Sequence, residues 1–113
     1  MIRLQLFGAV HVARADGADA GALLAQPKRL ALLAFLAAGA NTFHRRDSLL
    51  AVFWPELDQF AARRALRNTL YQLRLALGDD LISTRGDEEV MIDAAKVWCD
   101  VVALREADRK SVV

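Results

Sequence analysis

Four arginines lie within residues 59–77, a stretch that contains no aspartate or glutamate. The stretch reads QFAARRALRNTLYQLRLAL and carries a charge of +4, whereas the formal net charge of the whole chain is only +1. Arginine binds phosphate oxygens and the O6 and N7 atoms of guanine, and asparagine binds N6 and N7 of adenine. These residue types therefore indicate contact with nucleic acid, both at the phosphates and at the base edges.

The spacing of the apolar residues predicts that this stretch is one amphipathic helix. At 3.6 residues per turn a single stripe faces the core of the protein. An ordinary solvated helix face mixes acidic and basic residues, often as i, i+4 pairs. The opposite face of this helix has no acid, which favours phosphate contact over simple solvation. The predicted buried stripe is Ala62, Leu66, Leu70, Leu73 and Leu77.

The polar residues of this helix divide into two groups by their angle from the apolar stripe. Arg64 and Asn68 point furthest from it, one turn apart, and we interpret them as base readers. For Tyr71 two roles are open, contact with a thymine methyl or a phosphate and packing at the rim of the core. The other candidates are Gln72, a further base reader at the margin, and a phosphate-binding shoulder, Arg63, Arg67 and Arg74.

The N-terminal part of the chain predicts strands. Apolar and polar residues alternate over 2–6 and 10–12, a turn is expected at 15–17, and 22–24 is a possible third strand. An extended strand positions side chains alternately on two faces, so this part is expected to form an antiparallel sheet beside the helices.

Two further helices are expected before the arginine-rich one. The first covers 28–38 after Pro27 and has leucines on nearly every side, which is typical of a helix inside a domain. A connector, 41–45, leads to a second helix over 46–53. Asp58 is the expected N-cap of the arginine-rich helix, and Gly78 is its expected C-terminal stop.

The C-terminal part predicts a β-hairpin with strands over 81–84 and 89–92, then an extended piece over 95–99. Asp100 is expected to cap a last helix that runs through Ala107, and the sequence beyond it shows no pattern. The order of the elements indicates an α+β fold, a winged helix-turn-helix with an N-terminal antiparallel sheet, three helices and a C-terminal β-hairpin wing.

Composition excludes several classes of protein. With 113 residues and a hydrophobic fraction of 55%, the chain fits one folded domain. A single cysteine, Cys99, excludes an internal disulfide and a thiolate metal cluster, and His11 and His44 have no metal-ligand spacing. We expect no metal, no cofactor and no small-molecule ligand.

The longest apolar run, 30–40, is too short to span a membrane, and no signal-peptide pattern opens the chain, so a cytoplasmic location is expected. No nucleophile with a base and no phosphate loop is visible, so we do not expect an enzyme.

The run FHRRDSLLAVFWPELDQFAARRALRNTLYQLRLALGDDLISTRGD resembles the winged-helix domain of SARP-type bacterial transcription activators, which are relatives of the OmpR-type effector domains. The segments QPKRLALLAFLA and AKVWCDVVAL fit the same pattern, and the resemblance covers about residues 2–105. It implies that 59–77 is the major-groove helix and that two copies occupy direct-repeat half-sites. It also implies a contact with RNA polymerase by the loop before this helix, through Trp54, Glu56, Leu57 and Asp58. Residues 1–99 would then form the DNA-binding domain, and 100–113 would be the start of a downstream helical domain or a tail.

Two positions depart from that family pattern. Arg45 stands where a small N-capping hydroxyl is expected before the second helix. The tip of the predicted wing is acidic at residues 87–89, and carboxylates near phosphates oppose deep entry into a minor groove. Only Arg85 is left as a wing contact to DNA.

The leading hypothesis is therefore sequence-specific binding of double-stranded DNA by a bacterial transcriptional activator. The alternative is a winged-helix protein-interaction module that no longer binds DNA. Its support is the acidic wing and the nearly balanced charge of the whole chain.

Overall fold

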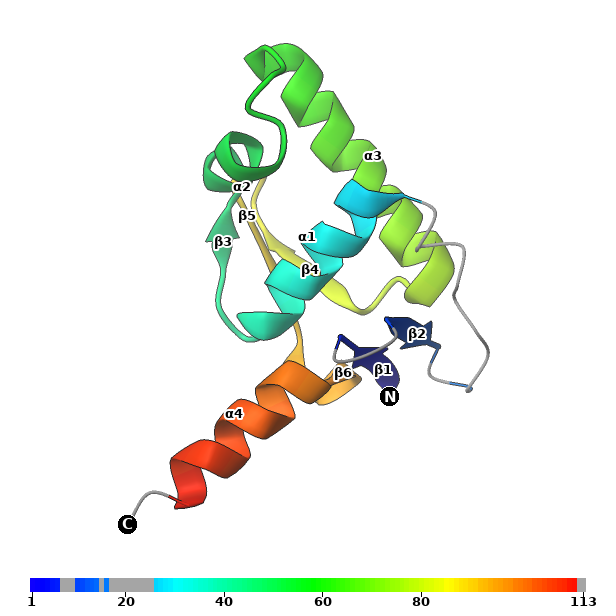
Figure 1. Ribbon diagram of the computed structural model, residues 1–113. Coiled ribbons are helices and arrows are strands. Elements are labelled where there is room, and N and C mark those ends of the chain that lie inside the picture. The colour runs from blue at the N-terminus through cyan, green and yellow to red at the C-terminus, as the bar shows by residue number, and fades with distance from the viewer. Residues whose placement is uncertain (7–9, 15, 17–25, 112–113) are drawn as a thin grey trace.

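The computed structural model describes residues 1–6, 10–14, 16 and 26–111. These residues form four α-helices and two three-stranded sheets (Figure 1), so the predicted α+β class is confirmed. The elements in chain order are β1 (Ile2–Gln5), β2 (His11–Ala13), α1 (Pro27–Ala38), β3 (His44–Arg45), α2 (Arg46–Phe53), α3 (Gln59–Leu77), β4 (Ile82–Arg85), β5 (Glu89–Ile92), the short 3₁₀ helix η2 (Ala94–Lys96), β6 (Val97–Cys99) and α4 (Asp100–Ser111).

The first sheet has the strand order β2-β1-β6. Ile2 and Leu4 of β1 are buried while Arg3 and Gln5 are exposed, as the alternation predicts. β1 pairs antiparallel with β2 but parallel with β6. The prediction of a purely antiparallel N-terminal sheet is therefore wrong, because a strand from the far end of the chain completes it. The possible strand at 22–24 lies outside the described residues, as does most of the predicted turn at 15–17.

The second sheet has the order β3-β5-β4 and contains the predicted hairpin. β4 and β5 pair antiparallel from Ile82 opposite Ile92 to Arg85 opposite Glu89, one residue later in β4 than expected. Gly86 at the turn has φ 60°, a conformation that glycine adopts without a steric cost. The predicted connector over 41–45 is wrong at its end, because residues 44 and 45 form β3 and pair with β5.

The predicted limits of α2 and α3 are confirmed, and α1 begins at Pro27, which the sequence favours as a first helical residue. The Asp58 carboxylate accepts a hydrogen bond of 2.8 Å from the Ala61 amide at the start of α3. Gly78, with φ 114°, ends this helix. Arg45 precedes α2 without a side-chain cap, which matches the expectation from its residue type.

Helix α4 differs from the predicted C-terminal helix in its length and in the position of Asp100. It extends through Ser111, beyond the predicted end at Ala107. Asp100 is its first residue, and both carboxylate oxygens lie 2.9 Å from the Leu6 amide, which donates to them. Arg105 donates to the Ala38 carbonyl at the end of α1, at 2.8 Å. In Figure 1 the helix leads away from the rest of the described chain beyond these contacts.

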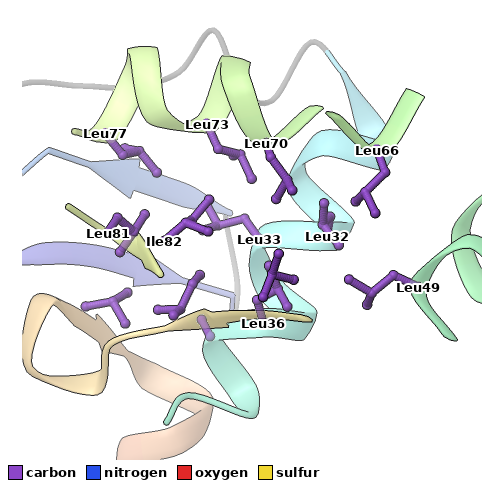
Figure 2. Packing of buried hydrophobic residues seen from close by; sticks show 14 of the residues in the cluster. Leu32, Leu33, Leu36, Leu49, Leu66, Leu70, Leu73, Leu77, Leu81 and Ile82 are labelled. Carbon is purple, nitrogen blue, oxygen red and sulfur yellow. The ribbon is translucent and has the colours of Figure 1, made fainter. Parts of the chain in front are cut away.

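The core lies where α3 packs on α1 and on the two sheets. Figure 2 shows leucines of α3 directed at leucines of α1, with Leu49 of α2 beside them. All five residues of the predicted α3 stripe are buried. Phe35 of α1 is 41% exposed, and its ring lies against the rings of His44 and Phe53. Within the described residues no helix is long and apolar enough to cross a membrane.

Leu66 is fully buried in the middle of α3, so truncation there tests this packing. We expect Leu66→Ala to lower the free energy of unfolding by about 2–5 kcal/mol, because it leaves a cavity between α3 and α1. Urea unfolding followed by circular dichroism measures the change.

The matched control is Leu75→Ala on the same helix. Leu75 is 56% exposed, so its truncation should change the free energy of unfolding by no more than about 0.5 kcal/mol. Equal losses in the two variants would contradict an α3 that buries Leu66 and exposes Leu75.

Candidate nucleic-acid interface

The outer face of α3 carries the polar residues that the sequence singled out. Figure 1 shows α1, α2 and both sheets on one side of this helix. Tyr71 is 56% exposed and does not belong to the buried core. Gln72 and Arg74 are half-buried at the margins. The predicted DNA-binding residues of α3 that are fully on the exposed face are Arg63, Arg64, Arg67, Asn68 and Tyr71.

Most of these guanidinium groups have no acidic partner. Arg63 pairs with Asp47 of α2 at 3.2 Å, and both side chains are about half exposed. Within the described chain, Arg64, Arg67 and Arg74 make no side-chain hydrogen bond or ion pair. An exposed pair such as that of Arg63 contributes little to stability and exchanges readily for another anion. The face therefore offers cationic donors to a ligand.

Two hollows lie beside these residues. The outer hollow brings together the two predicted base readers, and its lining is Ala61, Arg64, Ala65, Arg67, Asn68 and Tyr71. The arginine hollow lies between α2, α3 and the β4–β5 turn, and its lining is Arg46, Asp47, Arg63, Leu66, Arg67, Asp87 and Glu88. Arg67 lines both, so the two hollows are adjacent. Gln72 lines neither of them.

The N-terminus of α1 approaches the same surface from the other side. A third hollow is lined by Lys28, Arg29 and Asn68, among others. Lys28 forms an ion pair with Glu56, and its ammonium group lies 5.8 Å from the centre of the Trp54 ring. Arg29 is thus the more available of the two cations at this helix end.

Arg85, the predicted wing contact, is engaged within the hairpin. Its guanidinium donates two hydrogen bonds to the Glu89 carboxylate, at 2.8 and 2.9 Å, and lies 4.1 Å from the centre of the Phe43 ring. The hydrogen bonds from Arg85 hold the pKa of Glu89 below its usual value. The neighbouring Asp87 and Glu88 are exposed at the turn and face the arginine hollow.

The loop before α3 offers less surface than the sequence suggested for a polymerase contact. Trp54 is only 6% exposed and belongs to the core, so it is not available to a partner. Asp58 is used as the N-cap of α3. Glu56 is exposed, and the hydrogen bond from Lys28 lowers its pKa. Leu57 is 40% exposed and is the one apolar residue of the predicted contact that faces solvent.

Sequence reasoning missed two residues of this region. Thr69 lies on the buried side of α3, where its hydroxyl donates to the Ala65 carbonyl at 2.8 Å. Arg46 was assigned only to the start of α2, yet its side chain lies in the arginine hollow. The adjacent basic residues at 45 and 46 were the available signal, but only the packing of α2 on the hairpin shows which of them faces α3.

The described residues contain no group of histidine, cysteine and carboxylate side chains that could hold a metal ion. Cys99 is buried at 4% exposure, as expected for a small apolar side chain. A scan against protein-family models finds no match, and searches of curated proteins and of solved structures find no similar protein either. The function is therefore inferred from the residues and their geometry.

The Arg85–Glu89 pair gives a prediction for pH. We expect Arg85→Gln to raise the pKa of Glu89 toward its ordinary value, because the charge-assisted hydrogen bonds that favour the carboxylate are lost. A carboxyl with a lowered folded-state pKa stabilises the protein above its unfolded pKa, and this contribution is lost as pH falls through the folded value. Carboxyl chemical shifts followed by NMR across pH measure the change.

Asp80 is the internal control for that titration. Its pKa is lowered by a hydrogen bond from Lys96, a separate pair, and should not respond to Arg85→Gln. If the pKa of Glu89 stays where it was, Arg85 is not its main partner in solution.

Proposed function

We propose that this chain is a winged-helix DNA-binding module of a bacterial transcriptional regulator, an activator. In this proposal α2 and α3 form the helix-turn-helix, the β4–β5 hairpin is the wing, and α3 lies in the major groove of double-stranded DNA. The observation that carries the proposal is the cationic face of α3, opposite its buried leucine stripe, on which only Arg63 forms an ion pair within the described part of the chain. The proposal includes a cytoplasmic location for the protein.

The dimensions of α3 support this proposal. Its 19 residues give a length of about 28 Å, and the major groove of B-DNA, about 12 Å wide, admits one α-helix. The side chains on its exposed face are those that bind phosphates and base edges, and few of them are occupied by other groups of the protein.

Within this proposal the polar residues of α3 divide into those that read base edges and those that bind phosphates. Arg64 and Asn68 line the outer hollow together and read base edges, and Tyr71 contacts a thymine methyl or a phosphate beside them. Arg63, Arg67 and Arg74 neutralise phosphates, and Gln72 contacts the margin of the site. Phosphate contacts supply much of the affinity, whereas base contacts decide the sequence.

The wing contributes little to DNA binding in this proposal. Its turn carries Asp87 and Glu88, which repel phosphates, and its arginine, Arg85, is already paired with Glu89. One recognition helix, with a wing that contributes little binding, contacts only a short length of the duplex. We therefore propose that two copies bind direct-repeat half-sites, and that RNA polymerase is contacted through the exposed residues Glu56 and Leu57.

A second candidate function is a protein-interaction module that has kept this fold without binding DNA. It is favoured by the acidic hairpin turn and by three exposed apolar residues around the start of α3, namely Val52, Leu57 and Phe60 at 59%, 40% and 76% exposure. These side chains are available to a protein partner, which would cover them from water. This function requires no affinity for DNA.

Salt dependence distinguishes the two functions. We expect duplex DNA to bind with a logarithm of affinity that falls linearly with the logarithm of salt concentration. Arg67→Gln should flatten that slope by about 0.9, because one phosphate contact is lost. Fluorescence anisotropy of a labelled duplex at several salt concentrations measures the slope.

The matched control is Arg105→Gln, which removes the same charge from α4, away from α3. Its slope should equal that of the unaltered protein. If the unaltered protein binds no duplex even at low salt, the DNA-binding proposal fails and the protein-interaction module is favoured.

Base reading is tested separately, by selecting bound duplexes from a random pool. We expect Asn68→Ala to lose the preference at one A·T position, at a cost of about 1–3 kcal/mol for the preferred base, because a bidentate contact to adenine is removed. The salt slope should not change, since asparagine neutralises no phosphate. An unchanged preferred sequence would show that Asn68 does not read a base.

A further inference from the structure

Arg46 occupies an unusual position at the first residue of α2. Its backbone amide donates to the Glu88 carbonyl at 2.8 Å, which ties the start of α2 to the hairpin turn. The side chain then extends into the arginine hollow beside Arg63 and Arg67 of α3. The backbone of this residue is thus held by the hairpin turn, and its side chain lies beside α3.

The guanidinium of Arg46 has an unmet hydrogen-bond donor. Its Nε atom is buried and has no hydrogen-bond partner within the described chain. Burial lowers the pKa of Arg46, and the like charges of Arg74, Arg67 and Arg63 lower it further, while Asp87 opposes them. A buried donor without a partner destabilises a fold, and native structures rarely keep one without a reason. An anion in the hollow would relieve the repulsion, and it would meet the Nε donor once the guanidinium group turns toward the hollow.

The acidic residues of the hollow restrict which anion fits. Asp47 is paired with Arg63, whereas Asp87 and Glu88 line the hollow without a hydrogen bond to Arg46 or Arg67 among the described contacts. Carboxylates nearby repel a doubly charged phosphate more strongly than a singly charged one. A phosphodiester, which carries one negative charge, is therefore favoured over free phosphate.

The hollow also lies where a DNA strand would run. It shares Arg67 with the outer hollow that holds the proposed base readers, so a helix seated in the major groove brings one flank of the groove to Arg46. Phosphates line the flanks of that groove.

We propose that the arginine hollow binds one phosphodiester group of the DNA backbone, with Arg46 and Arg67 as its donors. Arg46 is then a DNA-contact residue contributed by α2 and oriented by the hairpin turn, and the unmet Nε donor is completed by the ligand. This inference rests on the proposed function.

The first test compares Arg46→Gln, Arg46→Lys and the control Arg105→Gln in the duplex titration at several salt concentrations. We expect Arg46→Gln to weaken binding about tenfold at 0.1 M salt and to flatten the salt slope by about 0.9. Arg46→Lys keeps the charge but not the Nε donor, so it should retain the slope and bind more weakly than the unaltered protein. Arg105→Gln should change neither quantity.

Thermal unfolding separates this role from a structural one. Because Arg46→Gln removes a buried unpaired donor and a repelled charge, its unfolding midpoint should not fall. A lower midpoint together with a slope equal to that of the unaltered protein would overturn the inference and make Arg46 a structural residue. If the unaltered protein binds no duplex, the proposed function fails first, and that result is distinct from an unchanged slope in Arg46→Gln.

The second test needs no substitution. In the unaltered protein, the Nε–H signal of Arg46 in an NMR spectrum should shift on addition of the duplex and should not shift on addition of inorganic phosphate alone. A shift of the α3 amide signals with the duplex while the Arg46 signal stays in place would overturn the inference. A shift with inorganic phosphate alone would assign the hollow to free phosphate rather than to a phosphodiester.

Discussion

The contact between the leucines of α3 and those of α1 is the constraint on which the surface of this protein depends. Successive residues of a helix are separated by about 100°, so burying one stripe fixes the rotation of the whole helix. Leu66, Leu70 and Leu73 are buried and point toward Leu32 and Leu33 of α1 (Figure 2). Because this stripe is buried, the arginines have to face outward, and no other contact is needed to aim them.

The charge distribution follows from that orientation. Like charges on one helix repel, but solvent screens them when they are exposed, so three arginines are tolerated on the outer face of α3 and a fourth, Arg74, at its margin. The compensating acids are placed on other elements, at Asp47 in α2 and at the hairpin turn. Opposite charges therefore face each other across a hollow rather than along the helix. A phosphate group of a ligand would have to replace these acids as the partner of the arginines. An exposed ion pair contributes little to stability, so it is replaced more easily than a buried one.

The small second sheet connects the hairpin to α2. β3 has two residues, and its pairing with β5 sets where α2 starts. The bond from the Arg46 amide to the Glu88 carbonyl continues this pairing into the helix. As a result the hairpin turn, α2 and α3 meet at one place, although β5 follows α3 in the sequence. The position of Arg46 is thus a property of the sheet as much as of the helix that contains it.

Features that depend on residues within one or two helical turns were predictable from the amino-acid sequence, whereas the contacts between distant segments follow only from the fold. The bounds of α3, its buried stripe and its caps at Asp58 and Gly78 depend on neighbouring residues, and the structure confirms them. The roles of its polar residues toward DNA stay predictions. The parallel pairing of β1 with β6 and the strand β3 arise because backbone donors and acceptors are satisfied across the chain. The surroundings of the Arg46 side chain also follow only from the fold, because they are formed by α2, α3 and the β4–β5 turn. Local periodicity carries no information on such contacts, since they are selected by the packing of whole elements against one another.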